Sequence, residues 1–318
     1  MYYEYFKIKE EPFSTTPDPR FLYRSSRHQE ALERLNAAVT MRRGVTALVG
    51  EPGLGKSTII RTMLQDLKNS VRFAWLFNTT LNSTELLKYI CRDFGLEPQG
   101  SDKGQVLMEL YTFLIEKYKK GYNCVLVIDE AQNLSPEVLE EIRLLSNLET
   151  VNNKLLQIVL SGQPELDEHL NAPELLQLKQ RISLKSTLVR LNREETHKYI
   201  LHRLNMAGAP VFNIFNKSAL HAVHQLSDGI PRMINHVCEN AMMLAAKQKL
   251  EKIDAGLVKE TARLGLISPV ESRSVMLKTD TKQENEKSQV NGIIRTIENE
   301  PESDKFGFID INELITVL

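Results

Sequence analysis

The sequence has few cysteines and no long apolar run. Its three cysteines, Cys91, Cys124 and Cys238, are scattered and form no CxxC pair. This spacing argues against a disulfide framework or a zinc site and favours free thiols in a reducing compartment. No apolar stretch approaches the roughly 18 residues that a membrane span needs, and the N-terminus lacks the basic-then-apolar pattern of a signal peptide. We therefore expect a cytoplasmic protein with no membrane span.

Neither sign of charge dominates the sequence. It contains 40 Lys and Arg against 41 Asp and Glu, a net charge of −1, so no overall field points to nucleic acid or an anionic membrane. The charge is uneven, however: residues 271–318 carry −4, and residues 1–270 carry +3. With 318 residues, of which 42% are hydrophobic, the chain is long enough for about two globular domains.

The most informative stretch is GEPGLGKS at 50–57, which matches the phosphate-binding pattern G-x-x-x-x-G-K-[ST] without a mismatch. Its glycines allow a tight turn with backbone N–H groups facing phosphate oxygens. Lys56 would reach the β- and γ-phosphates, Ser57 could bind Mg²⁺, and a helix from about Lys56 would place its positive dipole end under the phosphates. The predicted nucleotide-binding residues are Gly50, Glu51, Pro52, Gly53, Leu54, Gly55, Lys56, Ser57 and Thr58.

Asp129 and Glu130 follow a continuous apolar run at 124–128, which is typical of a central parallel strand. Acidic residues at the carboxyl end of such a strand lie where phosphate ligands bind in open α/β sheets. We predict that Asp129 joins Ser57 in binding Mg²⁺ and that Glu130 polarises the attacking water. Because the guanine-selective Asn-Lys-x-Asp pattern is missing, ATP is favoured over GTP.

Apolar periodicity predicts strands that alternate with helices, and hence an α/β fold with a doubly wound parallel sheet. Strands are expected at 45–49, 71–77, 124–128, 155–160 and 182–191. Helical patterns then run from Asn192 to about Leu264 without a strand, which predicts a small all-helical second domain. The predicted division is an N-terminal arm at 1–28, an α/β domain at 29–191, a helical domain at 192–267 and a polar tail at 268–318.

The two ends of the chain allow more than one interpretation. The arm is aromatic and punctuated by proline, without a clean helix or strand period. It either packs near the adenine of the nucleotide or wraps the surface and covers apolar area. The tail is predicted to be disordered to about Asp304. Its apolar end, from Phe306 to Leu318, is either a short partner-binding segment or a frayed end without a role.

Four further residues are candidates for sensing the nucleotide. Arg232 begins a helix in the helical domain, where it could fold over the γ-phosphate. Arg181 precedes the last predicted strand, where an arginine inserted into a neighbouring subunit's site would lie. Ser161 and Gln163 follow the strand at 155–160 and could hold the attacking water. The alternatives are surface arginines and a simple Ser-Gly-Gln-Pro turn.

Several further motifs occur in order along residues 1–267. They include PDPRFLY at 17–23, DEAQ at 129–132, GQPEL at 162–166 and GIPR at 229–232. As a set, with the phosphate loop, they resemble the AAA+ ATPases of the ExeA/GspA (general secretion pathway protein A) family. The resemblance implies a P-loop NTPase domain followed by a helical lid domain. It also implies a Walker A site at 50–57, a Walker B site at Asp129 and Glu130, a first sensor at Ser161 or Gln163, an arginine finger near Arg181 and a second sensor at Arg232.

The resemblance also implies what such an ATPase would do. Family members help build secretion pores or pili, which implies an ATP-hydrolysing ring that works with envelope assembly proteins. Some long members add a membrane span and a peptidoglycan-binding domain, and this sequence contains neither. Short members also resemble the TniB/TnsC-like ATPases, which assemble on DNA and select targets for a transposase. A DNA-associated transposition regulator is therefore the alternative, and a nucleotide-binding scaffold with little hydrolysis is a third possibility.

Overall fold

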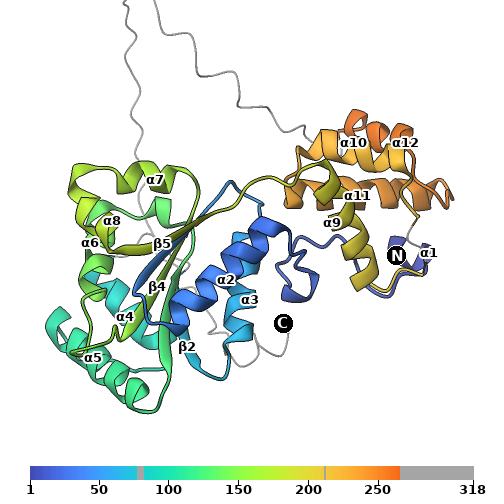
Figure 1. Cartoon of the computed structure of the whole chain (residues 1–318). Coiled ribbons are helices and arrows are strands. Elements are labelled where there is room, and N and C mark those ends of the chain that lie inside the picture. Colours follow the sequence, from blue (N-terminus) through green and yellow to red (C-terminus); the bar gives the residue numbers. More distant parts are fainter. Residues whose placement is uncertain (77–81, 211–212, 266–318) are drawn as a thin grey trace, which may run out of the picture. The chain divides into compact units, whose positions relative to one another are not determined.

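The computed structural model describes residues 1–76, 82–210 and 213–265 (Figure 1). A five-stranded sheet occupies the first part of the chain, with the strand order β2-β3-β4-β1-β5 and parallel pairing throughout. The three inner strands, β3, β4 and β1, are buried at every residue, as expected for strands covered on both faces. The strands are β1 (Val45–Val49), β2 (Val71–Leu76), β3 (Asn123–Ile128), β4 (Leu156–Gly162) and β5 (Ile182–Thr187). The predicted parallel sheet is confirmed.

Helices cover both faces of this sheet (Figure 1). Alternate strand residues point to opposite faces, so β3 contributes Val125 to one core and Leu126 to the other. Helices α2 and α3 pack in the core that contains Val125, and α4, α5 and α6 pack in the core that contains Leu126. The helices are α2 (Ser26–Thr40), α3 (Lys56–Asp66), α4 (Ser83–Asp93), α5 (Lys103–Lys119), α6 (Pro136–Leu145), α7 (Glu165–Leu170) and α8 (Leu176–Arg181).

Local sequence signals fix the starts of several helices. Ser135 caps α6, and Pro136 occupies its first position, where a missing N–H is not costly. Asn192 and Glu195 form the capping box of α9. Helix α3 begins at Lys56. The phosphate loop is therefore followed directly by the helix that its motif requires.

Some predicted boundaries are wrong. The last strand ends at Thr187 and not at 191, because the backbone N–H of Leu191 donates to Gly229 in the helical part and not to the sheet. Between β4 and β5, a helix at 173–181 is what the sequence pattern predicts; the structure has a 3-10 turn (Pro173–Leu175) followed by α8 there. Helix α7 is too short for its period to be visible in the sequence. Residue 77 of the second predicted strand and the tail at 268–318 lie outside the described residues.

The helical part has its own core. It contains the helices α9 (Arg193–Met206), α10 (Lys217–Ser227), α11 (Pro231–Lys247) and α12 (Ala255–Arg263). The N-terminal arm, which includes the short helix α1 (Tyr2–Tyr5), adds Phe6, Phe13 and Phe21 to this core. Phe13 is fully buried there, so the arm does cover apolar area, as one of its two interpretations expects. No described helix is long and apolar enough to cross a membrane.

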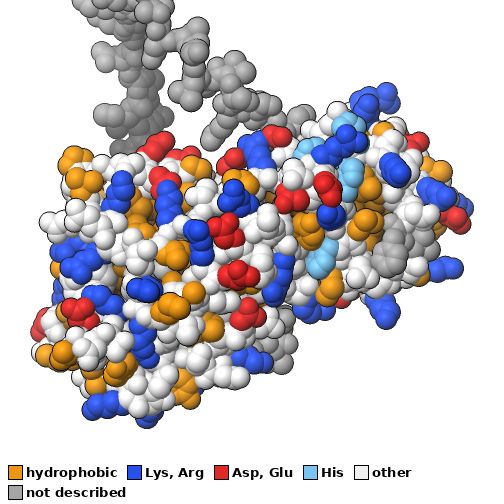
Figure 2. Space-filling view, in the orientation of Figure 1, with side chains coloured by type: hydrophobic (Ala, Val, Ile, Leu, Met, Phe, Trp, Pro, Cys, Tyr) orange, Lys and Arg blue, Asp and Glu red, His pale blue; other side chains and the backbone are white. Residues whose placement is uncertain are grey.

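Charges are mixed on the face seen in Figure 2. Lys and Arg side chains are scattered among acidic and apolar ones, and histidine side chains gather over the helical part. The excess of positive charge in residues 1–270 therefore does not form a single basic patch on this face.

Candidate nucleotide-binding site

The segment at 50–57 connects the end of β1 to the first turn of α3. Gly53 and Gly55 have φ angles of +81° and +96°, a region that residues with side chains rarely adopt. A Cβ atom at Gly53 would lie 2.8 Å from the Cβ of Arg232, so the close approach of α11 also requires glycine there. The loop thus turns tightly at a helix N-terminus, which is an arrangement that binds anions.

Lys56 is buried, with an exposed fraction of only 5%. Its Nζ donates to the carbonyl oxygens of Gly50 at 2.7 Å and Glu51 at 3.2 Å. Burial lowers the pKa of Lys56, although the carboxylates of Glu130 and Asp129 oppose that shift. The Lys56 ammonium has lost its water, and its partners in the loop are two neutral carbonyl oxygens. A negatively charged phosphate oxygen would be a stronger acceptor, so the site is well suited to bind one.

Asp129 connects three elements at the carboxyl edge of the sheet. Its Oδ2 accepts a hydrogen bond from Ser57 Oγ at 2.7 Å, and its Oδ1 accepts one from Ser161 Oγ at 2.7 Å. Hydroxyl and carboxylate oxygens are Mg²⁺ ligands, and these lie close enough to share one ion. The described residues include no group of three or more His, Cys, Asp or Glu that could hold a metal. One carboxylate and one hydroxyl fit Mg²⁺, which usually keeps water and phosphate as its remaining ligands.

Glu130 lies next to this pair in a left-handed backbone conformation, with φ 51° and ψ 41°. Its Oε2 accepts hydrogen bonds from Gln132 Nε2 at 2.7 Å and Gln163 Nε2 at 3.0 Å. Burial works to raise the pKa of Glu130, but these hydrogen bonds and the charge of Lys56 together lower it below its ordinary value. The carboxylate is therefore ionised and oriented, as a proton acceptor for water must be.

The two predicted arginines lie in different surroundings. Arg232, in the first turn of α11, donates its backbone N–H to the carbonyl oxygen of Gly53 at 3.1 Å and lines the same pocket as the loop. Arg181 is exposed at the end of α8 and is not among the residues that line this pocket. Of these two arginines, only Arg232 lies at the nucleotide site of its own chain.

A pocket of about 380 Å³ extends from the loop to the arm and the helical part. Its volume is within the range of roughly 300–1,000 Å³ that small-molecule sites occupy. The lining residues come from the arm, the α/β part and the helical part. The arm therefore borders the pocket in addition to covering apolar area. They are Ser14, Thr15, Thr16, Pro17, Asp18, Phe21, Leu22 and Tyr23 of the arm, His28, residues 52–58, Glu130, and Leu191, Tyr199, Arg203, Pro231, Arg232 and Asn235.

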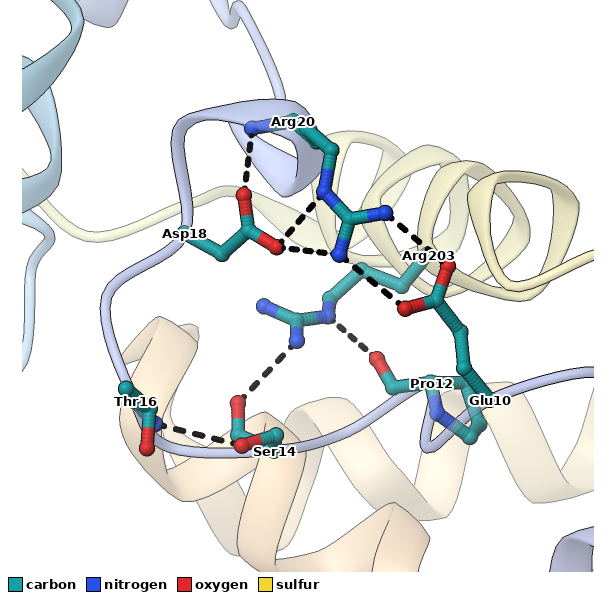
Figure 3. Close-up of polar contacts among 7 residues, drawn as sticks. All are labelled: Glu10, Pro12, Ser14, Thr16, Asp18, Arg20 and Arg203. Carbon is teal, nitrogen blue, oxygen red and sulfur yellow. Dashed lines mark hydrogen bonds and ion pairs between the residues drawn. The ribbon is translucent and has the colours of Figure 1, made fainter. Parts of the chain in front are cut away.

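Arg203 of α9, which the sequence did not indicate, joins the arm to the helical part (Figure 3). Its Nε donates to the carbonyl oxygen of Pro12 at 2.5 Å, and its Nη2 donates to that of Ser14 at 3.0 Å. The guanidinium also lies over the ring of Phe21, 4.7 Å from its centroid. Because a planar fork bonds two carbonyl groups at once, Arg203 fixes the path of the arm along the pocket.

Replacing Arg203 with Met is expected to lower the free energy of unfolding by about 2–4 kcal/mol, because two charged donors to the arm are lost. Denaturant unfolding measures this loss. Arg20 is the matched control, since it pairs with Asp18 and Glu10 in the same arm but is half exposed (Figure 3). Arg20→Gln is expected to cost less than about 1 kcal/mol. Equal losses would contradict the role given to Arg203.

His28 and Arg190 were also missed as site residues. His28 is buried, its Nε2 donates to the carbonyl oxygen of Leu54 at 2.9 Å, and its Nδ1 accepts from Ser25 Oγ at 2.7 Å. Burial lowers the pKa of His28, which favours the neutral ring that this pattern requires. Arg190 contacts Glu51 of the loop. No sequence signal pointed to Arg190, because the predicted last strand at 182–191 included it, whereas β5 ends at Thr187.

Comparisons with known proteins show what the chain is similar to. Residues 39–170 match the family described as AAA domain. Over 258 residues the chain is 43% identical to General secretion pathway protein A of Aeromonas hydrophila, a match that covers 80% of this chain. The chain is a homologue of general secretion pathway protein A. It spans 47% of the length of that relative.

More distant relatives of this GspA homologue share the core. ATP-dependent target DNA activator B of Escherichia phage Mu is 24% identical over 228 residues, which are 69% of this chain and 65% of that protein. The structure of Cdc6p from Pyrobaculum aerophilum aligns with a TM-score of 0.66 at 19% identity, over 84% of this chain and 74% of that one. That likeness shows the fold alone. Together with the matched AAA domain, it confirms the predicted fold class, a P-loop NTPase (AAA+) parallel-sheet domain followed by a small all-helical domain.

Proposed function

We propose that this GspA homologue binds ATP with Mg²⁺ and hydrolyses it to ADP and phosphate. The observation that carries the proposal is the convergence of Lys56, Ser57, Asp129 and Glu130 where β1 and β3 end. In this proposal the backbone N–H groups of the loop and Lys56 bind the β- and γ-phosphates. Ser57 and Asp129 hold the Mg²⁺ ion, which would neutralise charge on the phosphate oxygens.

Glu130 is the proposed general base for the attacking water. Gln163 orients it through the 3.0 Å hydrogen bond to Oε2, while Ser161 orients Asp129 through its own 2.7 Å bond. This division gives the two candidates for the first sensor different roles: Gln163 acts on the base, and Ser161 acts on the metal ligand. Ser161 lies in β4 and Gln163 directly follows it, and β4 pairs with β3 in the sheet.

The arginines and the arm complete the proposed machinery. Arg232 would contact the γ-phosphate, since it begins α11 at the loop. Arg181 would act on the nucleotide of a neighbouring subunit in a ring, since it is exposed and outside the pocket of its own chain. The arm at 1–28 would border the adenine. The domain boundaries at 28, 191 and 267, and a cytoplasmic location, stay predictions from the sequence.

For the process, we propose assembly work in secretion or pilus biogenesis, with envelope assembly proteins as partners. The identity of 43% to General secretion pathway protein A supports this choice over other AAA+ roles. A DNA-associated transposition regulator is the second candidate, and the similarity to the phage Mu target DNA activator supports it. The face drawn in Figure 2 shows no cluster of basic side chains of the kind that a DNA-binding surface needs.

One assay tests both the activity and the process. The purified chain is expected to release phosphate from ATP only when Mg²⁺ is present, and more slowly from GTP. If the chain works on envelope proteins, duplex DNA is expected to change that rate by less than about twofold, because such work needs no contacts to DNA phosphates. No phosphate release with the chain folded would contradict the hydrolysis proposal and favour a nucleotide-binding scaffold. Strong stimulation by DNA, with binding that weakens steeply with salt, would support the transposition candidate instead.

A further inference from the structure

A short connection joins β5 to α9, and its two ends are bonded to different parts of the protein. The backbone N–H of Leu188 donates to Val49 in the sheet at 2.8 Å, and that of Leu191 donates to Gly229 in the helical part at 2.9 Å. A Cβ atom at Gly229 would lie 2.0 Å from the carbonyl oxygen of Leu191, so the two segments are in close contact. Val189 and Arg190 are the two residues between these attachment points.

The side chain of Arg190 contacts both sides of this connection. Its Nε lies 3.1 and 3.0 Å from the two carboxylate oxygens of Glu51, and its Nη2 donates to Glu51 Oε2 at 2.5 Å. Its Nη1 forms an ion pair with Asp228, which precedes Gly229 and has a left-handed backbone conformation. One guanidinium therefore bonds an acid of the phosphate loop and an acid at the start of the segment that leads into α11.

Glu51 is bonded through its backbone as well. Its carbonyl oxygen accepts from Lys56 Nζ at 3.2 Å, so the conformation of residue 51 is set by Lys56 on the main chain and by Arg190 on the side chain. Two residues further along, the carbonyl oxygen of Gly53 accepts from the backbone N–H of Arg232. These bonds connect the phosphate loop directly to the first turn of α11, which gives a physical route for coupling between the loop and the helical part.

We propose that Arg190 is a positioning residue that couples the phosphate loop to the helical lid domain. Through Glu51 it holds the loop in the conformation that accepts phosphate, and through Asp228 it places the first turn of α11, which carries Arg232. Arginine suits this position because its planar fork can bond two carboxylates in fixed directions, whereas a lysine ammonium cannot. The inference rests on the proposed function, since it assigns Arg190 to the nucleotide site.

The three side chains are partly exposed, so the ion pairs themselves contribute little to folding. Their effect is expected on binding, because a loop held in the bound conformation loses less entropy when the ligand arrives. Arg190→Ala and Glu51→Gln are each expected to raise the dissociation constant of a non-hydrolysable Mg²⁺–ATP analogue by about three- to tenfold. Asp228→Asn is expected to raise it by about twofold, since only the lid contact is lost.

The test is a double-mutant cycle measured by calorimetry on the full chain. If Arg190 acts through Glu51, the variant with both Arg190→Ala and Glu51→Gln binds no more weakly than the weaker single variant. Arg190→Lys is expected to recover only part of the affinity. Arg143→Ala is the matched control, because Arg143 forms a similar bidentate pair with Glu140 within α6, away from the pocket. Its dissociation constant should equal that of the parent.

Hydrogen exchange of the nucleotide-free protein separates this inference from the proposed function. Loop amides at 50–57 are expected to exchange faster in Arg190→Ala than in the parent and in Arg143→Ala. A parent chain that binds no nucleotide would overturn the proposed function, while faster loop exchange would still support the coupling. Additive effects of the two substitutions, or unchanged loop exchange in Arg190→Ala, would overturn the role given to Arg190.

Discussion

Replacing Glu130 with Gln is expected to slow ATP hydrolysis by about 10²–10⁴-fold, while nucleotide binding stays close to that of the parent. The amide keeps the size of the side chain but cannot take a proton from water. Lys56, Ser57 and Asp129, which bind the phosphates and Mg²⁺ in our proposal, are unchanged by the substitution. Steady-state phosphate release and the affinity for a fluorescent ATP analogue measure the two effects separately.

The control for this substitution is Glu140→Gln, which neutralises a half-exposed acid on α6 that pairs with Arg143. It should hydrolyse ATP at the parent rate.

The pH dependence gives a second check, because the lowered pKa of Glu130 keeps its carboxylate ionised as the pH falls through the ordinary glutamate range. Gln163→Ala removes one of the hydrogen bonds that lower this pKa, so the pKa of Glu130 should rise. As the pH is lowered, this variant should therefore begin to lose activity at a higher pH than the parent. An unchanged rate in Glu130→Gln would remove Glu130 from the role of base.

Replacing Lys56 with Ala is expected to raise the dissociation constant for Mg²⁺–ATP by roughly 10²–10⁴-fold. Charge-assisted hydrogen bonds contribute about 1.5–3 kcal/mol each, and the ammonium is proposed to contact two phosphates. The folded chain should not lose stability, because the substitution removes a buried charge whose partners in the loop are two neutral carbonyl oxygens. Calorimetric titration and thermal unfolding of the same samples give both quantities.

Lys68→Ala is the matched control, since Lys68 is an exposed lysine just beyond the end of α3. Its affinity for the nucleotide should equal that of the parent. If Lys56→Ala bound Mg²⁺–ATP as tightly as the parent, the phosphate loop would not be the nucleotide site. The roles proposed for Ser57, Asp129 and Glu130 would then lose their basis together, because all three depend on where the triphosphate lies.

Much of the fold could be predicted because the signals are local. The runs at 45–49 and 124–128 are continuously apolar, and a strand buried on both faces of a parallel sheet has that pattern. The start of α6 at Pro136 and the capping box of α9 depend on neighbours within three residues. The end of β5 could not be predicted, because Leu191 bonds to Gly229, a residue 38 positions away. The apolar pattern of 182–191 is the same whether Leu191 pairs with the sheet or with the helical part.

The sequence by itself determined the phosphate loop, the two acids after β3 and the order of an α/β part and a helical part, since each is written in consecutive residues. Only the tertiary structure decided which groups act on them. Gln163 reaches Glu130, Arg203 reaches the arm, and Arg190 reaches Glu51 across 139 positions of the chain. These contacts depend on the strand order and on the packing of α9 and α11. A side chain's partners across such distances are set by how elements pack and not by any local preference.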